Sequence, residues 1–465
     1  MYRVFGHYLP RASLVLFCTE LSVLLVSVIV AALIASFEGV DVEALVSEPK
    51  LMVEAGLFAG SILTGMFATG LYQRDQRDTP FEALLRIAVA FVIGLVLLFG
   101  FGFALPGQRF EGSLLPLSLL ASLIGITSCR LVYFDATEAR LARRVVVLGS
   151  GARAAEIAHL RRAADRHGVD ILGFLPCSGD EVAQIEAERR IDLGDETLSD
   201  FVATARVDEL VIAPDDRRAG MPDAEMLDCK LQGVRITDLD HFLERQLGRL
   251  RLSALKPSQL LYSESLTNVI VRPWGKRTLD ILVSLVMVIL LSPLFLLTVI
   301  AIKLDSRGPA LYCQRRVGLG GEVFTLCKFR SMRTDAEVDG KARWATDQDP
   351  RITRVGSFIR KTRIDELPQL FNVLKGDMSF VGPRPERPAF VVELCEQIPY
   401  YELRHYVKPG LTGWAQTRYP YGASIEDARA KLEFDLYYIK NYSFVLDLNI
   451  ILDTVQVVLW RKGAR

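Results

Sequence analysis

Four long apolar runs occupy the first third of the chain, and charged residues are concentrated in the loops between them. The runs cover residues 14–37, 51–72, 83–105 and 114–134. Each is close to the ~20 residues that a helix needs to cross the hydrocarbon core of a bilayer. The loop after the first run is acidic, whereas arginines follow the second and fourth runs. Because basic residues are enriched in cytoplasmic loops, this pattern predicts a four-helix transmembrane region over residues 1–142 with both ends in the cytoplasm.

One acidic residue, Glu20, lies inside the first apolar run. A charge within a membrane helix is costly unless it finds a partner or reaches the interface. Glu20 is near the expected cytoplasmic end of its helix, so we expect its carboxylate to reach the interface or a neighbouring helix.

From Arg143 onward the apolar residues form short runs that are typical of buried strands and are separated by helical stretches. The runs begin at Arg143 and continue with ILGFLP (171–176), ELVIAP (209–214) and VRITDLD (234–240). Strands that alternate with helices predict a parallel α/β sheet, and we assign residues 143–262 to a Rossmann-like domain. GSGARA (149–154) fits the G-x-G-x-x-A pattern, with Asp180 at a distance suited to a ribose contact. That signal is weak alone, so we favour a structural loop over a dinucleotide site.

The remaining third, residues 272–465, opens with a charge-free stretch, Ile281–Ile302, that is long enough to span a bilayer. Ser292 and Pro293 lie at its middle, where the proline removes a helix hydrogen bond and predicts a sharp kink. Cations lie on both flanks: Lys276, Arg277, Lys303 and Arg307. Two basic flanks predict a helix–break–helix over residues 278–302 that enters the cytoplasmic leaflet and returns. The alternative is a kinked fifth span.

Composition agrees with a membrane protein and excludes some classes of function. Half of the residues are hydrophobic and the mean hydropathy is +0.25, which is high for a soluble protein. The formal net charge is zero, which argues against nonspecific nucleic-acid binding. The 7 cysteines are scattered without a CxxC pair, so the sequence indicates no zinc site and no disulfide framework, only thiols in a reducing compartment.

Positive charge gathers within the last third of the chain. Residues 315–363 hold 12 Lys/Arg against 6 Asp/Glu. Such an excess beside a membrane segment suggests a phosphate-bearing ligand or anionic headgroups. Glycines and prolines interrupt the cations at 318–321, 349–356 and 381–386. Loops of this composition form rigid pockets that aim arginine side chains.

Two carboxylates, Asp365 and Glu366, follow the last of these cations. Apolar residues recur at helical spacing after them, and Pro368 is tolerated only in a first helical turn. This predicts both acids at a helix N-terminus, where Asp365 is either an ordinary cap or part of a phosphate site. We favour the phosphate site: one carboxylate attacks phosphorus and its neighbour binds Mg²⁺. Adjacent helical residues point about 100° apart, so we expect separate roles.

Several longer motifs resemble the bacterial sugar transferase family over roughly residues 272–465. They are IKLDSRGPALYCQRRVG, KFRSMRTDA, DPRITRVG, IRKTRIDELPQLFNVLKGDMSFVGPRPE and VKPGLTGWAQ. The resemblance implies a polyprenyl-phosphate phosphoglycosyl transferase with a monotopic catalytic core, in a long form with an N-terminal bundle and an α/β domain. The implied reaction transfers sugar-1-phosphate from a UDP-sugar to undecaprenyl phosphate, giving a polyprenyl-diphospho-sugar and UMP. It is the first membrane step of exopolysaccharide or O-antigen synthesis.

The resemblance also implies roles for individual residues. Asp365 matches the nucleophile that forms a covalent phosphosugar intermediate, and Glu366 matches the residue that binds Mg²⁺. Five cations are implied at the phosphates of the substrate: Lys328, Arg330, Arg351, Arg360 and Arg384. Two pairs match the membrane element: Lys276 and Arg277 at the prenyl-phosphate entry, and Ser292 and Pro293 at the re-entrant break.

The expected fold class is a multidomain membrane protein. It combines an all-α four-helix transmembrane bundle, an α/β Rossmann-like domain and an α/β catalytic domain with a re-entrant membrane helix. The resemblance places it in the bacterial inner (cytoplasmic) membrane, multi-pass, with the catalytic domain on the cytoplasmic side. It also suggests a homodimer through the extra domains.

One loop departs from the pattern of many relatives. WAQTRYPYGAS (414–424) replaces a V-x-G-R continuation and resembles the subgroup tied to exopolysaccharide and exosortase clusters. The transferred sugar is left open, with glucose and galactose phosphate as the family candidates. Two other functions remain as alternatives: a nucleotide-sugar oxidoreductase, which lacks a Tyr-x-x-x-Lys after the middle strands, and a membrane scaffold of a polysaccharide assembly system.

Overall fold

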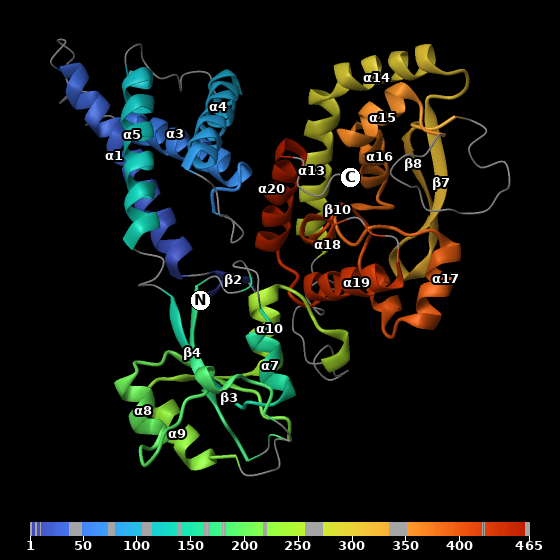
Figure 1. Cartoon of the computed structure of the whole chain (residues 1–465). Helices are drawn as coiled ribbons and strands as arrows, with labels where there is room; N and C mark the ends of the chain where they lie inside the picture. Colours follow the sequence, from blue (N-terminus) through green and yellow to red (C-terminus); the bar gives the residue numbers. More distant parts are fainter. Residues whose placement is uncertain are drawn as a thin grey trace. The chain divides into compact units, whose positions relative to one another are not determined.

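The chain divides into two compact units, which are described separately. The first unit ends at Leu247 and the second extends from Gly248. The computed structural model describes residues 2–4, 7–9, 11–36, 49–72, 80–104, 114–136, 142–160, 165, 168–178, 180, 183–216, 221–255, 273–333, 351–420, 422 and 424–460 (Figure 1). The boundary expected between residues 262 and 272 lies outside these ranges.

The four apolar runs are helices, as the sequence predicts. They are α1 (Arg11–Ser36), α3 (Pro49–Ala68), α4 (Pro80–Ala104) and α5 (Leu114–Ala136), and two short strands, β1 (Tyr2–Val4) and β2 (His7–Leu9), precede them. All four are long and apolar enough to cross a membrane. Helix α1 packs on α5, and α3 packs on α4. A Cβ at Gly65 would lie 2.1 Å from the carbonyl oxygen of Ala90, so only glycine permits the close approach of α3 and α4.

The acid inside the first helix is paired with a neighbouring helix, which is one of the two alternatives expected. Arg130 Nε of α5 lies 2.7 Å from Glu20 Oε1, and the Tyr72 hydroxyl donates to the other carboxylate oxygen. Arg130 Nη1 also donates to the carbonyl of Leu71 at 2.9 Å. The buried carboxylate therefore connects α1, α5 and the end of α3.

The middle of the chain forms a four-stranded parallel sheet, as predicted. Its elements are β3 (Arg143–Leu148), α7 (Ala152–Ala158), β4 (Val169–Leu175), η2 (Ala187–Arg189), α8 (Leu198–Thr204), β5 (Glu209–Ile212), α9 (Asp223–Leu231), β6 (Arg235–Asp238) and α10 (Leu239–Leu247). The strand order is β4-β3-β5-β6, the flavodoxin type of doubly wound order.

Helices cover both faces of this sheet. Apolar residues of α7 and α10 pack on one face, and those of α8 and α9 pack on the other (Figure 1). A parallel sheet that is buried on both faces requires continuous apolar strands, which explains the run at Val145, Val146 and Val147. At the N-terminal ends of the two central strands, the buried carboxylate of Glu209 accepts from Arg143 Nη1 at 2.6 Å and from Arg245 Nη2 at 2.8 Å.

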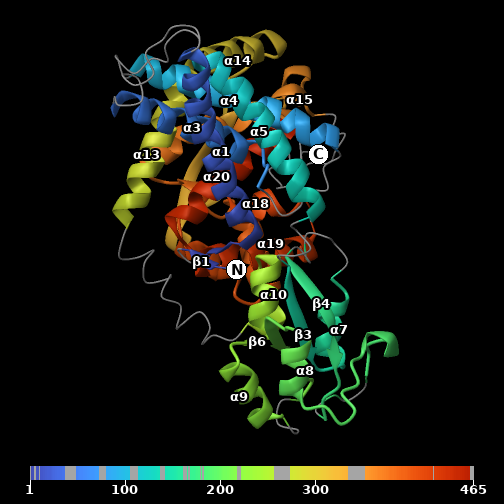
Figure 2. The ribbon, with the colours of Figure 1, turned by 90° about the vertical axis from the view of Figure 1, so that its left-hand side faces the viewer.

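The second unit begins with two helices that meet at a sharp bend. Helices α13 (Pro273–Leu290) and α14 (Ser292–Asp305) are inclined by 61° (Figure 2). Pro293 lies in the first turn of α14, where the missing N–H has no helical partner to lose. The break occurs at Leu291, directly before the Ser292–Pro293 step that the sequence indicates. A bend of this size occurs in a broken span as well as in a re-entrant element.

The rest of the second unit is a mixed α/β structure. Its strands are β7 (Leu311–Val317) and β8 (Val323–Phe329), which form an antiparallel hairpin, and β9 (Ser379–Val381) and β10 (Gly410–Thr412), which pair in parallel. Its helices are η3 (Leu252–Ala254), η4 (Leu319–Gly321), α15 (Arg354–Lys361), η5 (Ile364–Glu366), α16 (Gln369–Lys375), α17 (Pro388–Gln397), η6 (Tyr401–Tyr406), α18 (Trp414–Arg418), α19 (Ile425–Lys440) and α20 (Phe444–Trp460).

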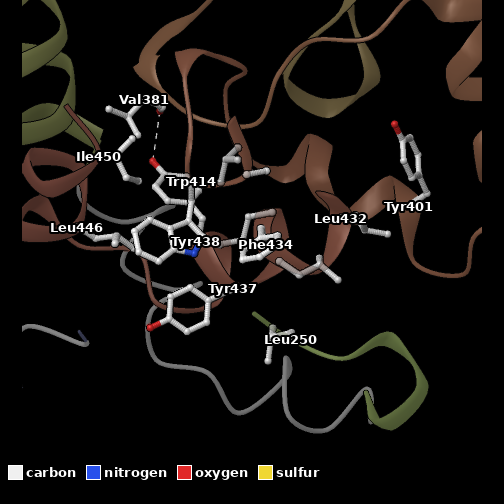
Figure 3. Packing of buried hydrophobic residues seen from close by; sticks show 14 of the residues in the cluster. Leu250, Val381, Tyr401, Trp414, Leu432, Phe434, Tyr437, Tyr438, Leu446 and Ile450 are labelled. Carbon is white, nitrogen blue, oxygen red and sulfur yellow. Dashed lines mark hydrogen bonds between the residues drawn. The ribbon is translucent and has the colours of Figure 1, made fainter. Parts of the chain in front are cut away.

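Aromatic and aliphatic side chains of α18, α19 and α20 form the main core of this unit (Figure 3). Trp414 stacks on Tyr437 with ring centroids 5.8 Å apart, and the Tyr438 hydroxyl donates to the Val381 carbonyl. Residues 248–255, which the sequence analysis assigns to the middle domain, belong to this core. Leu250 is buried in it, and Trp414 Nε1 donates to the carbonyl of Gly248 at 2.7 Å.

The β7–β8 hairpin carries a feature that the sequence did not indicate. Cys313 and Cys327 are directly opposite each other in the hairpin, with Cα atoms 4.3 Å apart, and are joined by a disulfide. Close cross-strand pairs of this kind bring the two cysteine side chains near enough for their sulfur atoms to bond. The expectation that all thiols are free was wrong for this pair, because 14 residues of sequence separation hide the pairing.

Candidate active site

Asp365 and Glu366 occupy a short turn that precedes a helix, and neither is the helix cap. Helix α15 ends at Lys361, and Arg363 adopts the left-handed conformation with φ of 57°. The two acids then form the 3₁₀ turn η5, and α16 has Pro368 at its N-cap position. The expectation of a helix N-terminus is therefore corrected: the left-handed Arg363 reverses the chain first. The turn buries both acids between α15 and α16.

The carboxylate of Glu366 is surrounded by cations from three parts of the chain. Its Oε1 lies 3.0 Å from Lys328 Nζ of β8, 2.9 Å from Arg384 Nη2 in the loop after β9, and 3.7 Å from Arg363 Nη1. Burial by itself raises the pKa of Glu366, but attraction by Lys328 and Arg384 outweighs it and holds the pKa well below the ordinary value. Glu366 is thus a fixed anion that gathers cations.

Asp365 is in a different electrostatic situation. Among the described residues, no hydrogen bond or ion pair reaches its carboxylate, although the residue is only 9% exposed. Burial, followed by repulsion from Glu366, raises the pKa of Asp365 to about 6. A carboxylate of raised basicity without a partner is a better nucleophile than an ordinary aspartate, and most of it is still ionised at neutral pH. The two adjacent acids therefore differ in their electrostatic environments, and separate chemical roles for them stay a prediction.

The structure brings some of the five predicted phosphate-site cations to the acids and gives others different neighbours. Lys328 and Arg384 contact Glu366 directly, and the positive charge of Arg360 on α15 acts on Asp365. Arg330 is buried and donates to the carbonyls of Ser306 and Arg307 at 2.8 and 3.0 Å. Arg330 therefore fixes the end of α14. Arg351 is half-buried, and its carbonyl accepts from the Arg333 N–H.

The predicted prenyl-phosphate pair lies on α13 and contacts other parts of the second unit. Lys276 Nζ donates to Asp447 of α20 at 2.7 Å. Arg277 Nη1 and Nη2 donate to the last carbonyls of α16, Val373 and Leu374, at 2.5 and 2.6 Å. A cation at a helix C-terminus is favoured by the helix dipole. These contacts make both cations anchors of α13, and a role toward prenyl phosphate stays a prediction.

Three residues of this region were missed as site residues. Arg363 contributes the third cation near Glu366, and Gln416 of the WAQ motif accepts from Arg384 Nη1 at 3.1 Å. Asp280, one turn after Lys276, accepts from the Ser379 hydroxyl and the Phe380 N–H at 3.0 and 2.9 Å. Arg363 and Gln416 stand within motifs that the sequence analysis quotes, whereas Asp280 is an acid in an apolar helix, which is itself a signal.

The residues present fit a magnesium ion of the kind that binds phosphates. Mg²⁺ usually takes one or two protein carboxylates and completes its shell with water and phosphate oxygens. Glu366, which the resemblance matches to the metal, supplies one such carboxylate, and within the described ranges no group of three His, Cys, Asp or Glu offers an all-protein metal site. Glu366 Oε1 is already occupied by cations, so its other oxygen is the one left for a metal.

The glycine-rich loop of the middle domain is already occupied by the protein's own acids. Asp215 accepts from the N–H groups of Ala152 and Arg153 at 3.1 and 2.9 Å. Asp180, the candidate ribose ligand, accepts instead from the Ser150 N–H at 2.7 Å. The loop N–H groups that bind a pyrophosphate in dinucleotide sites are thus paired with carboxylates. This arrangement favours the structural role of the loop.

Comparisons with known proteins give the second unit a family. A model described as "Bacterial sugar transferase" matches residues 271–461. The chain is 45% identical over 251 residues to the UDP-N-acetylgalactosamine-undecaprenyl-phosphate N-acetylgalactosaminephosphotransferase of Aeromonas hydrophila, covering 54% of this chain and 58% of that protein. It is 34% identical over 342 residues to the undecaprenyl-phosphate glucose phosphotransferase of Komagataeibacter xylinus, covering 70% and 60%.

A shorter relative is matched over almost its whole length by less than half of this chain. The chain is 46% identical over 195 residues to the "Exopolysaccharide production protein PSS" of Rhizobium leguminosarum bv. phaseoli, covering 40% of this chain and 97% of that protein. The matches to the Aeromonas and Komagataeibacter proteins span less than two thirds of either relative.

The raised pKa of Asp365 can be tested by direct titration. A carbodiimide activates the protonated carboxyl group, so the labelling of Asp365, followed by peptide mass spectrometry, should fall with rising pH and reach half its maximum near pH 6. In Glu366→Gln the neighbouring negative charge is gone, and the midpoint should shift to lower pH. A midpoint at the ordinary aspartate value of about 3.9 in the unsubstituted protein would contradict this account.

Proposed function

The chain belongs to the bacterial sugar transferase family, and from this premise we propose that it transfers sugar-1-phosphate from a UDP-sugar to undecaprenyl phosphate. The products are a polyprenyl-diphospho-sugar and UMP, and the step begins the membrane stage of exopolysaccharide or O-antigen synthesis. The names of the Aeromonas and Komagataeibacter relatives support the proposal, since both specify undecaprenyl phosphate and transfer of a sugar phosphate.

One observation carries the proposal: two adjacent buried carboxylates, of which one is held by cations and the other is left without a partner. A general acid–base pair would need both acids at the reacting group. A nucleophile beside a cation-gathering acid instead suits covalent transfer of a phosphoryl group. The raised pKa of Asp365 increases its basicity and hence its nucleophilicity.

The proposed reaction has two displacements at the same phosphorus. In the first, an Asp365 oxygen attacks the β-phosphorus of the UDP-sugar, a bond from Asp365 to phosphorus forms, and the bond from that phosphorus to the UMP oxygen breaks. UMP leaves with the electron pair. In the second, an oxygen of undecaprenyl phosphate attacks the phosphorus, and the bond to Asp365 breaks. The carboxylate is regenerated, so no proton or electron is left unbalanced.

The cations around Glu366 are placed to stabilise the charge that moves in these steps. Lys328 and Arg384 lie on the same carboxylate oxygen, and Arg360 acts on Asp365. Fixed cations in a site that excludes water are the main source of stabilisation in phosphoryl transfer. A Mg²⁺ held by Glu366 would neutralise diphosphate oxygens when bound. A phosphate-binding role for Arg330 and Arg351, which the resemblance implies, remains part of the proposal.

The bent helix pair is proposed to be the re-entrant element that holds the site at the cytoplasmic surface of the inner membrane. Apolar side chains project outward on both halves of the pair: Leu282, Val286, Ile289 and Leu290 from α13, and Leu296 and Leu297 from α14. Cations flank both ends, which disfavours a crossing. An undecaprenyl phosphate headgroup lies at that surface, and Lys276 and Arg277 are the cations at the entry of the element.

The nucleophile assignment is tested by substitution. Asp365→Asn keeps the shape of the side chain and removes its negative charge, so UMP release from a UDP-sugar with undecaprenyl phosphate in detergent should fall by about a thousandfold or more. The exposed Asp195→Asn is the matched control and should retain full activity. Comparable UMP release from Asp365→Asn and the control would remove Asp365 from the nucleophile role.

The transferred sugar is identified by a separate measurement, in which UDP-glucose, UDP-galactose and UDP-N-acetylgalactosamine are compared as donors for UMP release.

The membrane topology is tested by labelling single cysteines on either side of the bend. We expect Trp274→Cys and Arg307→Cys, each in a background without other free thiols, to react with an impermeant maleimide only when the cytoplasmic face is open, as in inverted membrane vesicles. Both positions are exposed. Labelling from opposite faces would show a fifth span and would place the site outside the cell.

A further inference from the structure

The loop that carries Arg384 has few ways to fix its own conformation. It reads GPRPE, residues 382–386, and its two prolines have no N–H to donate. The carbonyl oxygens therefore provide most of the attachment points of the backbone. Four consecutive carbonyls accept hydrogen bonds from outside the loop, at Pro383, Arg384, Pro385 and Glu386.

Two of these four carbonyls are held by arginine side chains, and they belong to Arg384 itself and to the residue after it. Arg404 Nη2 of η6 donates to the carbonyl of Arg384 at 2.9 Å. Arg316 Nη1 of β7 donates to the carbonyl of Pro385 at 3.0 Å. The outer two, Pro383 and Glu386, accept from the backbone N–H groups of Gly410 and Val317.

Arg404 is buried and has a second, ionic partner. Its Nη2 lies 3.0 Å from Asp435 Oδ2 of α19, and both side chains are less than a tenth exposed. Its other terminal nitrogen donates to the hydroxyl of Tyr401. A buried ion pair of this kind adds little to stability compared with apolar packing. The planar guanidinium, however, can direct several donors at fixed angles, which an ammonium group cannot do.

The side chain of Arg384 is aimed by this loop at two groups. Arg384 Nη2 donates to Glu366 Oε1 at 2.9 Å and Nη1 donates to Gln416 at 3.1 Å. Both hydrogen bonds therefore depend on where the loop backbone holds Arg384. The distance from Asp435 to Glu366 is thus bridged by Arg404, the loop backbone and Arg384.

We propose that Arg404, held by Asp435, and Arg316 are positioning residues that fix the backbone directly after the Cα of Arg384 and thereby aim its guanidinium at the reaction centre. Neither residue needs to touch the substrate for this role. The inference rests on the proposed function for its catalytic consequence, whereas the aiming itself is a property of the fold. The proposal gives a positioning role to a buried ion pair, Arg404 with Asp435, that does not itself contact Glu366.

The test combines Arg404→Lys with Arg384→Ala in a double-mutant cycle on the full-length protein in detergent. Arg404→Lys keeps the charge opposite Asp435 and loses the forked donor, so kcat/KM for the UDP-sugar should fall roughly tenfold. In the Arg384→Ala background the same substitution should change kcat/KM less than about twofold, because the side chain to be aimed is absent. Arg249→Lys is the matched control. Its ion-pair partner, Glu433, is on the same helix as Asp435, but this pair lies away from the loop.

A second readout does not depend on turnover. Phenylglyoxal modifies accessible guanidinium groups, and Arg384 should react several times faster in Arg404→Lys than in the unsubstituted protein or in Arg249→Lys, as followed by peptide mass spectrometry. If Arg404→Lys does not fold, Arg316→Lys is taken through the same measurements, with the same expectation.

The outcomes separate the two proposals. Faster modification of Arg384 without UMP release from any donor would support positioning and reject the proposed function. Normal turnover with additive effects in the cycle and an unchanged Arg384 modification rate would overturn the positioning role, and Arg404 would then serve stability alone.

Discussion

The arrangement of cations in the second unit depends on one constraint: two adjacent buried acids, Asp365 and Glu366, must both be able to carry a negative charge. Repulsion between neighbouring carboxylates and the loss of hydration both oppose ionisation of a buried pair. Cations from β8, from the loop after β9 and from Arg363 satisfy Glu366. This leaves Asp365 ionised near neutral pH and without a bound partner. The placement of the hairpin and of the GPRPE loop can be understood from this one requirement, because each supplies one cation.

The helix that leads into the bend connects these elements to one another. Helix α13 packs against α16 and β9, and it presents three polar side chains over little more than one turn. Lys276 reaches α20, Arg277 reaches the end of α16, and Asp280 reaches β9. The turn with the acids precedes α16, and the loop with Arg384 follows β9. A displacement of α13 would therefore move both the turn with the acids and the loop with Arg384, which links the bent helix pair to the proposed reaction centre.

Much of this organisation could be predicted from the sequence, because it is expressed in local patterns. Hydrophobic runs of span length, strands separated by helices, and a proline in an apolar stretch each have one dominant physical cause. The structure has four apolar helices, a parallel sheet and a helix break directly before Ser292 and Pro293. What was missed depends on contacts between distant residues. The 3₁₀ turn at Asp365 depends on the left-handed conformation of Arg363. Arg330 is directed into the protein because it donates to a carbonyl at the end of α14. The hydrogen bond from Arg404 to Arg384 joins residues that are 20 positions apart. No periodicity encodes such pairings.

The central claim is that Asp365 becomes covalently attached to the sugar phosphate during the reaction. The most direct measurement is peptide mass spectrometry of the full-length protein after incubation with a UDP-sugar in the absence of any polyprenyl phosphate. The account predicts UMP release in an amount equivalent to the enzyme, and a sugar-phosphate adduct on the peptide that contains Asp365, which disappears when undecaprenyl phosphate is added. UMP release that requires the acceptor from the start, without an adduct on Asp365, would contradict it.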